Sequence, residues 1–316
     1  MAARTARTGY PWVMRICVTG AGGKLGSTLV PHLVDHGHEV VATDAVYRSG
    51  LPCRLHLQDL LDFRGVYPLL EGCDAVVHAG NHPHAHAARP YQRLLAENVA
   101  MNANVFRAAA ELGVPRVVFV SSIQVTTGVP ADKYWTGETP ACRLPYLPWD
   151  GGLPHRPGDN PYALSKCAGE DMLQAMCDAR PEWSAAAVRF PYLLSDNDVE
   201  RPRGHYVRHP LTENDRRLID GLCYLFHHDA CSFLRRCVEH RAPGYRAWLT
   251  AQTLGVAGMT PSRVAEAYFG WLPVRRPLDE LGGLIDLAAA RETLGWRPES
   301  ASLTLEEGEP TEKTYS

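Results

Sequence analysis

A glycine-rich segment, Gly20-Ala-Gly-Gly23-Lys-Leu-Gly26, restricts the possible folds most strongly. It follows an apolar, β-branched run at 13–19 and precedes a helical pattern at 25–34. Glycines between a strand and a helix allow a tight turn and let backbone N–H groups approach a diphosphate, which the helix N-terminus also attracts. Asp44 ends the next predicted strand, 39–44, where a carboxylate accepts hydrogen bonds from an adenosine ribose. The pattern predicts a dinucleotide-binding unit; the alternative is a plain turn with a surface acid.

Strand-like and helix-like patterns continue to alternate after this unit. Apolar runs predict strands at 74–79, 116–121 and 185–190, and helical patterns cover 91–112 and 161–179. Strands that alternate with helices are typical of a parallel sheet covered on both faces. We therefore predict an α/β fold, with a doubly wound parallel sheet (Rossmann-type) and a smaller C-terminal substrate lobe.

Regular alternation ends after Phe190, and only short helices are predicted beyond it. One of them begins at Thr260-Pro261, because threonine is a good N-cap and proline fits the first helical position. The predicted short helices cover 231–238, 261–268 and 287–294.

Length and composition limit the domain organisation and the class of protein. The 316 residues suffice for one large domain or two coupled domains. A net charge of −3 without a basic stripe argues against a nucleic-acid partner, and no apolar run is long enough to predict a membrane span. Nine cysteines without a C-x-x-C pair predict reduced thiols, and the first residues lack the apolar core of a secretory signal, so we expect a cytoplasmic protein.

The predicted segments are a flexible N-terminal extension 1–12, an NAD-binding Rossmann domain 13–190, a mainly substrate-binding lobe 191–305 from which some strands return to the sheet, and a flexible tail 306–316.

Tyr162 and Lys166 lie four residues apart in a predicted helix and therefore share one face. An ammonium beside a phenol lowers the pKa of the phenol, which makes the tyrosine a proton acceptor for a substrate hydroxyl. Ser121-Ser122 ends a predicted strand at the edge where a doubly wound sheet places its active site, so a serine hydroxyl is expected to hold the substrate oxygen. The alternative is that Tyr162 and Lys166 belong to a solvated helix face.

Together these residues resemble the extended short-chain dehydrogenase/reductase family, which contains NAD-dependent sugar epimerases, dehydratases and dehydrogenases. Thr19-Gly20-x-x-Gly23-x-x-Gly26 resembles its cofactor loop, and Tyr162 with Lys166 matches its catalytic pair. The resemblance extends from about Met14 to Pro298. Further matching segments are Asp59-Leu60 with Asp62, His78-Ala79-Gly80, Asn98-Val99 with Asn104-Val105, Ser122-Ile-Gln-Val125, His228-Asp229-Ala230 and the run from Ala288 to Pro298.

The resemblance implies a set of site residues and NAD as the cofactor, with no metal. Asp44 favours NAD over NADP because its carboxylate repels a 2′-phosphate, while nearby Arg48 acts against that preference. The predicted catalytic residues are Ser122, Tyr162 and Lys166. The predicted cofactor-binding residues are Gly20, Gly23, Lys24, Leu25, Gly26, Asp44, Asp59, Leu60, Ala79, Gly80, Asn98, Ser121, Tyr162, Lys166 and Pro191. The predicted substrate-facing residues are Gln124, Tyr192, Arg201, Arg203 and Arg208, and a solvated loop is an equal alternative for the three arginines.

Departures from the family pattern narrow the reaction and the substrate. The family's dehydratases carry an Asp-Glu pair after the catalytic hydroxyl residue, whereas this chain has Ile123-Gln124, which argues against dehydration. Tyr192 replaces an asparagine that is common in nucleotide-sugar enzymes and weighs against a nucleotide-diphosphate sugar. Glu170-Asp171 resembles the uronate-oxidising branch, although the region after residue 190 is longer than expected for that branch.

We predict an NAD-dependent oxidoreductase or epimerase that acts by hydride transfer on a hydroxyl of a sugar, a sugar acid or a nucleotide sugar. The sequence does not separate net oxidation from epimerisation. The alternative from another class is a non-catalytic NAD-binding, redox-sensing module on the same fold. His82, His84 and His86 alternate in one loop, which we interpret as a polar loop over the cofactor rather than a metal site.

The two long predicted helices also bear on assembly. Each has more apolar positions than one sheet covers, which favours a homodimer with a four-helix bundle at its two-fold axis. The alternative is that these side chains complete the core of a single chain. The positions are Val99, Val105 and Phe106 on the first helix and Met172, Leu173 and Met176 on the second.

Overall fold

The computed structural model describes residues 13–84, 89–127, 144–195, 216–240 and 242–305. The chain divides into two compact units that interleave along the sequence and are described separately. The first unit comprises residues 1–121, 161–188 and 230–248, and the second comprises 122–160, 189–229 and 249–316. The predicted functional division at residue 190 stays a prediction.

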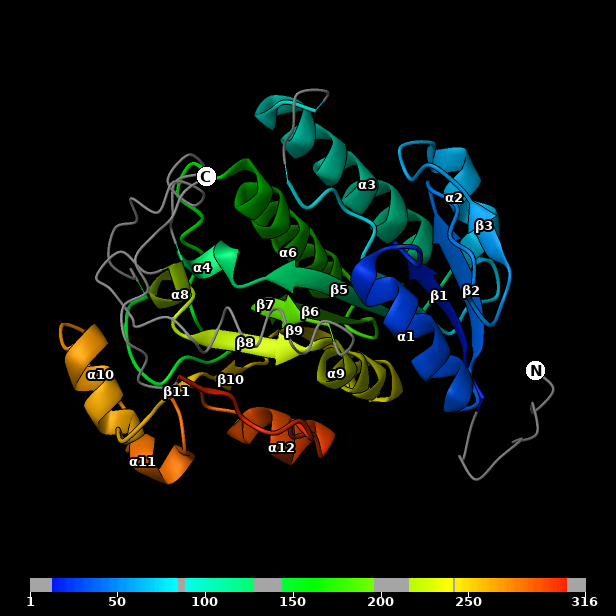
Figure 1. The fold of residues 1–316 in the computed structure, drawn as a ribbon. Helices are drawn as coiled ribbons and strands as arrows, with labels where there is room; N and C mark the ends of the chain where they lie inside the picture. The colour runs from blue at the N-terminus through cyan, green and yellow to red at the C-terminus, as the bar shows by residue number, and fades with distance from the viewer. Residues whose placement is uncertain (1–12, 85–88, 128–143, 196–215, 241, 306–316) are drawn as a thin grey trace, which may run out of the picture. The chain divides into compact units, whose positions relative to one another are not determined.

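A seven-stranded sheet forms the centre of the first unit (Figure 1). Its order is β3-β2-β1-β4-β5-β6-β9, and β1 pairs in parallel with both β2 and β4, as β4 does with β5. This confirms the predicted doubly wound parallel α/β fold. Because parallel strands end at a common edge, Thr19, Asp44 and His78 all lie at the edge that faces a ligand in such folds. The strands are β1 Arg15–Thr19, β2 Glu39–Asp44, β3 Leu55–Leu57, β4 Ala75–His78, β5 Arg116–Ser122, β6 Ser184–Phe190 and β9 Gly244–Leu249.

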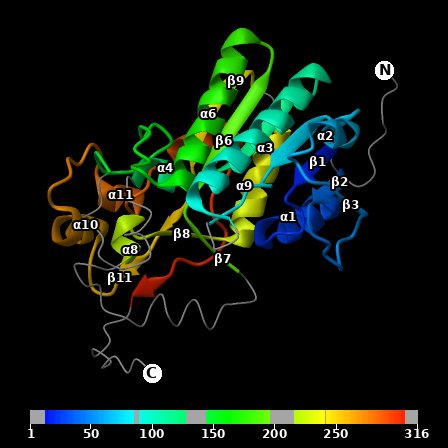
Figure 2. The same cartoon turned by 90° about the horizontal axis from the view of Figure 1, so that it is seen from above.

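Helices cover both faces of this sheet. Helices α2, α3 and α6 lie on one face and α1 and α9 on the other, with α3 and α6 side by side (Figures 1 and 2). Gly113 follows α3 with a positive φ of 68°, a conformation that glycine adopts without strain and that ends the helix as predicted. The helices are α1 Lys24–Asp35, α2 Phe63–Leu70, α3 Tyr91–Glu111, α6 Pro161–Ala179 and α9 His227–Glu239.

The core of the first unit corrects part of the dimer argument. Val105, Phe106 and Leu173 are completely buried within the single chain, so they complete its core rather than form a seam between two chains. The apolar faces of α3 and α6 are wide because the two helices pack against each other as well as against the sheet. Met172 and Met176 are only partly buried against this core.

The second unit contains more strands than the sequence indicated. Its helix α10 begins as predicted: the side chain of Thr260 accepts a hydrogen bond from the N–H of Arg263, and Pro261 occupies the first turn. Parallel β7 and antiparallel β10 flank β8, and Trp149, Tyr224 and Phe269 are buried in a separate core. The elements are α4 Gln124–Thr127, β7 Tyr192–Leu194, α8 Arg216–Ile219, β8 Cys223–Phe226, β10 Gln252–Thr253, β11 Gly255–Val256, α10 Pro261–Phe269, α11 Leu278–Leu281, α12 Ala288–Leu294 and β12 Thr304–Leu305.

Two expectations from composition concern cysteines and membranes. The described cysteines are free thiols, all buried except the half-buried Cys53. Within the described ranges, no helix combines the length and the apolar character that a membrane crossing requires.

Candidate active site

The glycine turn between β1 and α1 is held so closely to the end of β4 that its first glycine has no room for a side chain. Gly20 has a φ of 70°, and a Cβ on it would lie 2.7 Å from the carbonyl carbon and oxygen of Ala79. A Cβ on Gly26 would lie 2.1 Å from the carbonyl oxygen of Gly20, so α1 also packs against the turn. Both contacts require glycine, which is the role that the dinucleotide-binding pattern gives to these positions.

Asp44 joins this turn to the end of β2. Its Oδ2 accepts a hydrogen bond of 2.9 Å from the N–H of Gly22, and its Oδ1 accepts one of 3.1 Å from the N–H of Val46. The guanidinium of Arg48 donates to the carbonyl oxygen of Gly22 over 3.0 Å. Asp44 and Arg48 therefore both lie at the glycine turn, where a carboxylate and a cation have opposite effects on a bound phosphate.

A cavity of about 460 Å³ opens in the first unit beside the glycine turn. Its size lies within the usual range of about 300–1,000 Å³ for small-ligand sites. The predicted cofactor-binding residues that line it are Gly20, Gly23, Asp44, Asp59, Leu60, Ala79 and Gly80. The others do not line it, namely Lys24, Leu25, Gly26, Asn98, Ser121, Tyr162, Lys166 and Pro191. His82, which was interpreted as part of a polar loop over the cofactor, also lines it. Further lining residues were not predicted, namely Gly22, Ala45, Val46, Tyr47, Gln58, Leu61, Asn81, Arg89, Arg93, Glu97 and Met101.

The residues that line the cavity fit an NAD-type dinucleotide. Gly20 and Gly23 line it at the turn where such folds hold a diphosphate, and the Asp44 carboxylate ends the strand on which they hold a ribose diol. Asp59 accepts the N–H of Leu61 over 2.9 Å, which fixes the turn beneath the adenine side of the cavity that the resemblance assigns to Asp59 and Leu60.

A chain of buried polar side chains begins behind the glycine turn. The N–H of Gly80 donates to Thr19 Oγ1, which lies 2.7 Å from His78 Nδ1, and His78 Nε2 lies 2.9 Å from Asn102 Oδ1. Burial, and then the charge of Lys166, lower the pKa of His78 to about 3, so the imidazole is neutral at pH 7. Since Asn102 Oδ1 only accepts, His78 Nε2 carries the proton and Nδ1 accepts from Thr19.

The same chain ends at Lys166 on α6. Lys166 Nζ donates to Asn81 Oδ1 over 2.8 Å and to the carbonyl oxygen of Val120 over 2.6 Å. Asn81 in turn donates to Asn102 Oδ1 over 2.9 Å, so Asn102 accepts from two sides. We refer to Thr19, His78, Asn81, Asn102 and Lys166 as the buried network.

Lys166 is the titratable group of the buried network whose pKa lies close to 7. Its side chain is 2% exposed, and this burial lowers its pKa to about 7, while the carboxylate of Glu170 acts in the opposite direction. Its Nζ lies 4.6 Å from the ring centre of Phe119 and 5.6 Å from that of Tyr162. Glu170 is held by hydrogen bonds from the hydroxyls of Ser121, over 2.5 Å, and Tyr245, over 3.1 Å.

Asn98 and Ser165 connect the helix of Tyr162 to the loop after β4. Asn98 Oδ1 accepts the N–H of His82 over 2.8 Å, and Asn98 Nδ2 donates to the carbonyl oxygen of His82 and to Ser165 Oγ. Ser165 Oγ donates to the carbonyl oxygen of Tyr162 over 2.7 Å. Asn98, which was predicted to contact the cofactor, thus holds a loop that lines the cavity.

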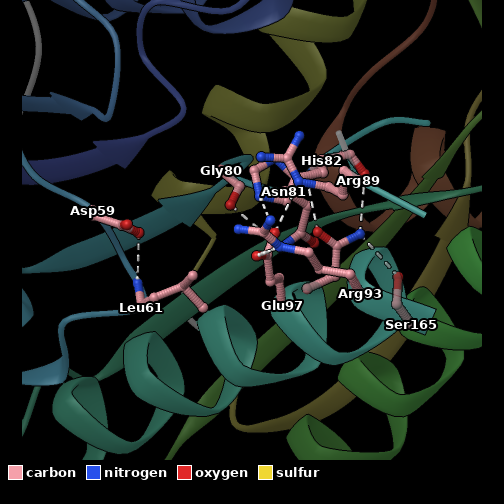
Figure 3. Close-up of polar contacts among 10 residues, drawn as sticks. Asp59, Leu61, Gly80, Asn81, His82, Arg89, Arg93, Glu97 and Ser165 are labelled. Carbon is pink, nitrogen blue, oxygen red and sulfur yellow. Dashed lines mark hydrogen bonds and ion pairs between the residues drawn. The ribbon is translucent and has the colours of Figure 1, made fainter. Parts of the chain in front are cut away.

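A charged group lines the cavity near the start of α3 (Figure 3). Glu97 accepts hydrogen bonds from Arg89 Nε over 2.8 Å and Arg93 Nε over 2.5 Å, and His82 Nε2 lies 3.2 Å from it. Burial raises the pKa of Glu97, but the hydrogen bonds from Arg93 and Arg89 outweigh it and hold the pKa below its usual value. We refer to His82, Arg89, Arg93 and Glu97 as the arginine cluster.

The remaining predicted site residues belong to the second unit or lie outside the described residues. Ser122 Oγ accepts the N–H of Gln124 over 3.2 Å, and Gln124 Oε1 accepts from Asn160 over 2.9 Å. Pro191 precedes β7, and the side chain of Tyr192 is 43% exposed. Ser122 belongs to the second unit and Tyr162 to the first, so the Ser-Tyr-Lys site stays a prediction. His86, Arg201, Arg203 and Arg208 lie outside the described residues.

A family model described as "NAD dependent epimerase/dehydratase family" matches residues 16–227. A uronate dehydrogenase from Pseudomonas syringae pv. tomato is 33% identical over 161 residues, which are 50% of this chain and 52% of the relative. An NAD-dependent glucose-6-phosphate dehydrogenase from Haloferax volcanii is 27% identical over 165 residues, 50% of this chain and 60% of the relative. The chain therefore spans little more than half the length of these curated relatives.

Solved structures are similar over most of the chain. A UDP-galactose 4-epimerase superposes with a TM-score of 0.60 at 23% identity, covering 92% of this chain and 95% of the other. The uronate dehydrogenase from Agrobacterium tumefaciens superposes with a TM-score of 0.54 at 20% identity, covering 92% and 91%. At these identities the likeness establishes the fold alone.

Proposed function

Because this chain belongs to the NAD-dependent epimerase/dehydratase family, we propose that it oxidises a hydroxyl group of a sugar acid with NAD. The predicted resemblance to extended short-chain dehydrogenases/reductases and the predicted cofactor agree with that family. The observation that carries the proposal is the buried Lys166, which lies one helical turn after Tyr162 and is fixed by Asn81 and the carbonyl of Val120.

Each predicted catalytic side chain has a distinct part in the proposed reaction. When NAD is bound, its nicotinamide supplies the acceptor for the hydride that leaves the substrate carbon. Tyr162 accepts the proton of the substrate hydroxyl at its phenolic oxygen, and Ser122 donates a hydrogen bond to that substrate oxygen. The ammonium form of Lys166 favours the phenolate of Tyr162, since an opposite charge stabilises the ionised form.

The buried network supports this chemistry by fixing the lysine. Asn81 presents its amide oxygen to Lys166 Nζ because its own N–H is committed to Asn102, which also accepts from the neutral His78. Thr19, His78, Asn102 and Lys166 are buried, and the half-buried Asn81 links them to the cavity, so the lysine is held by protein groups. A pKa of about 7 for Lys166 leaves both of its protonation states accessible at neutral pH.

A sugar acid is favoured over the other substrate classes by two observations. The similar uronate dehydrogenase and the Glu170-Asp171 pair both point to oxidation of a sugar acid. Ile123 and Gln124 offer no titratable pair for the loss of water, so dehydration is not proposed.

The test is a panel of uronic acids and matching neutral sugars with NAD, followed by the absorbance of NADH. We expect stoichiometric NADH with at least one uronic acid and less with its neutral counterpart. Interconversion of sugars without net NADH, with cofactor retained through gel filtration, would instead identify an epimerase. NAD binding without turnover of any member would favour the non-catalytic redox-sensing module.

We also propose a homodimer in which the outer sides of α3 and α6 meet across a two-fold axis. The half-buried Val99, Met172 and Met176 offer apolar contacts there, whereas Phe106 belongs to the core. Light scattering at micromolar concentration should give twice the mass of 34.9 kDa, and a monomer mass that persists at higher concentration would refute the dimer.

A further inference from the structure

Three residues with titratable side chains follow one another along α6 at steps of four. Tyr162, Lys166 and Glu170 therefore lie on one face of the helix, about one turn apart. The first two are the predicted catalytic pair, and the third is a carboxylate that the proposed reaction does not use. Lys166 is 2% exposed and Glu170 is 1% exposed, so the carboxylate is buried as deeply as the lysine.

The lysine and the carboxylate are both held by adjacent residues of β5. Lys166 Nζ donates to the carbonyl oxygen of Val120 over 2.6 Å, and the hydroxyl of the next residue, Ser121, donates to Glu170 Oε1 over 2.5 Å. The hydroxyl of Tyr245, on β9, donates to Glu170 Oε2 over 3.1 Å. Hydroxyl donors to both oxygens favour the ionised carboxylate, because hydrogen bonds to the charged form stabilise it. A negative charge is thus fixed one helical turn from the lysine.

The hydrogen bonds of Lys166 go to neutral acceptors, namely the amide oxygen of Asn81 and a backbone carbonyl oxygen of β5. Burial lowers the pKa of Lys166 to about 7, and the carboxylate of Glu170 acts against that effect. Of the other titratable groups around the lysine, His78 on β4 is neutral at pH 7, and Tyr162 on α6 is uncharged until it loses its proton. Glu170 therefore supplies a full opposite charge to the buried ammonium.

We propose that Glu170 is the counter-charge that keeps Lys166 in its ammonium form. Ser121 and Tyr245 hold the carboxylate in place for this role. Glu170 is a positioning residue, because it acts on the reaction through Lys166, whose charge favours the phenolate of Tyr162. The catalytic part of the inference rests on the proposed function, whereas the charge pair itself is measurable without a substrate. The alternative is a carboxylate that only joins α6 to β5 and β9.

A double-mutant cycle on stability tests the charge pair without a substrate. The variants of the full chain are Glu170→Gln, Lys166→Met and the double variant, and urea unfolding is measured at pH 6 and at pH 9. Glutamine keeps the size of the side chain and an acceptor for a hydroxyl, so the cycle isolates the loss of charge. The matched control is Asp178→Asn in the same cycle, because Asp178 is an exposed carboxylate of α6 about three turns beyond Lys166.

We expect a coupling of about tenfold in the unfolding equilibrium constant at pH 6, because Lys166 is charged there in the folded protein. The coupling should fall below about twofold at pH 9, where the folded protein holds the neutral amine. The cycle with Asp178→Asn should show no coupling at either pH. No coupling at pH 6, or an equal coupling at both pH values, would overturn the inference, since packing and hydroxyl contacts would then account for Glu170.

The pH profile of kcat/KM, measured with NAD and the sugar acid found in the panel, tests the effect on the reaction. Glu170→Gln should move the alkaline limb, along which the lysine loses its proton, to lower pH by about one to two units. Glu170→Asp keeps the charge and should restore most of the limb. An unchanged limb in Glu170→Gln, or an equal shift in Glu170→Asp, would contradict a role through charge.

Tyr245→Phe gives a second variant for the same profile, because it removes one hydroxyl donor and leaves the carboxylate. It should move the alkaline limb in the same direction by a smaller amount, and it takes the place of Glu170→Gln if thermal melting shows that Glu170→Gln does not fold. An unchanged limb in Tyr245→Phe would then overturn the inference. Absence of turnover with every sugar acid would instead refute the proposed function and leave the result of the cycle intact.

Discussion

The buried network and the arginine cluster lie in the same unit and share the loop after β4, yet they are built in opposite ways. Asn81 of the network and His82 of the cluster are adjacent in sequence. The network consists of polar groups that donate to and accept from one another, all of them buried except the half-buried Asn81, with Lys166 as its single cation. The cluster carries full charges at a partly exposed rim. A network of polar partners fixes one side chain in place by hydrogen bonds, whereas the arginine cluster is held together by ion pairs to one carboxylate.

The largest expected effect concerns the reaction that the buried network is proposed to support. Tyr162→Phe removes the proton acceptor and keeps the ring, so we expect kcat to fall about 10²- to 10⁴-fold, with NAD affinity unchanged. The control is Tyr67→Phe, since Tyr67 is a partly buried tyrosine of α2 whose hydroxyl donates to Glu111 and which does not line the cavity. Steady-state kinetics with the substrate found in the panel, together with calorimetry for NAD, measure both quantities. Near-full turnover by Tyr162→Phe would show that Tyr162 is not the proton acceptor and that the network does not support catalysis through it.

The second prediction compares two asparagines on α3. Asn102→Ala leaves the buried His78 and Asn81 without their shared acceptor, so we expect a loss of about 2–4 kcal/mol in the free energy of unfolding. Asn104→Ala removes hydrogen bonds to the carbonyls of Leu60 and Leu61 at a more exposed place, and about 1 kcal/mol is expected. Urea unfolding measures both. Equal losses in the free energy of unfolding would mean that burial does not make the hydrogen bonds of the network more important than those of a more exposed contact.

The third prediction concerns the pH dependence of stability. Burial lowers the pKa of Lys166 from 10.5 to about 7, so between these values the unfolded chain binds this proton and the folded chain does not. The cost of the buried charge is fully present below pH 7 and is removed as the pH rises toward 10.5. The contribution of Lys166 to stability therefore increases with pH in this window, by at most about 1.4 kcal/mol per pH unit.

Urea unfolding of the wild type and of Lys166→Met at pH 6, 7.5 and 9 isolates this contribution. The wild type should gain stability relative to the variant between pH 7.5 and pH 9, and the difference should be flat below pH 7. Parallel curves over the whole range would show that Lys166 is charged in the folded protein up to its ordinary pKa.

The first unit was predictable because its elements are long and their patterns regular. The predicted helix 161–179 coincides with α6, and the predicted strand 39–44 coincides with β2. In the second unit, β10, β11 and β12 have two residues each, which is too short for a period to be recognised. Their pairing depends on tertiary contacts, such as the hydrogen bond from the N–H of Leu303 to the hydroxyl of Tyr224.

The candidate site was predictable where the sequence motif is local. The glycine turn and Asp44 lie together at the cavity as expected, because strand, turn and helix are consecutive. Asn81 and Asn102 were missed, since their partners lie on other elements and only the fold brings them together. Arg89, Arg93 and Glu97 were missed although they are close in sequence. The Arg93-Glu97 spacing of four residues was a visible signal, but such pairs are common on exposed helix faces.

The smallest expected effect separates cofactor choice from cofactor affinity, and it concerns Asp44. We predict that the wild type prefers NAD over NADP, because the Asp44 carboxylate repels the 2′-phosphate, and that Asp44→Ala narrows the preference about tenfold, or ~1.4 kcal/mol. Since Asp44 Oδ2 also fixes the N–H of Gly22, some loss of NAD affinity accompanies the gain for NADP. Adding Arg48→Ala should reverse that gain if the guanidinium, which bonds to the carbonyl of Gly22, takes the phosphate. A wild type that binds NADP as tightly as NAD would show that the Asp44 carboxylate does not repel the 2′-phosphate.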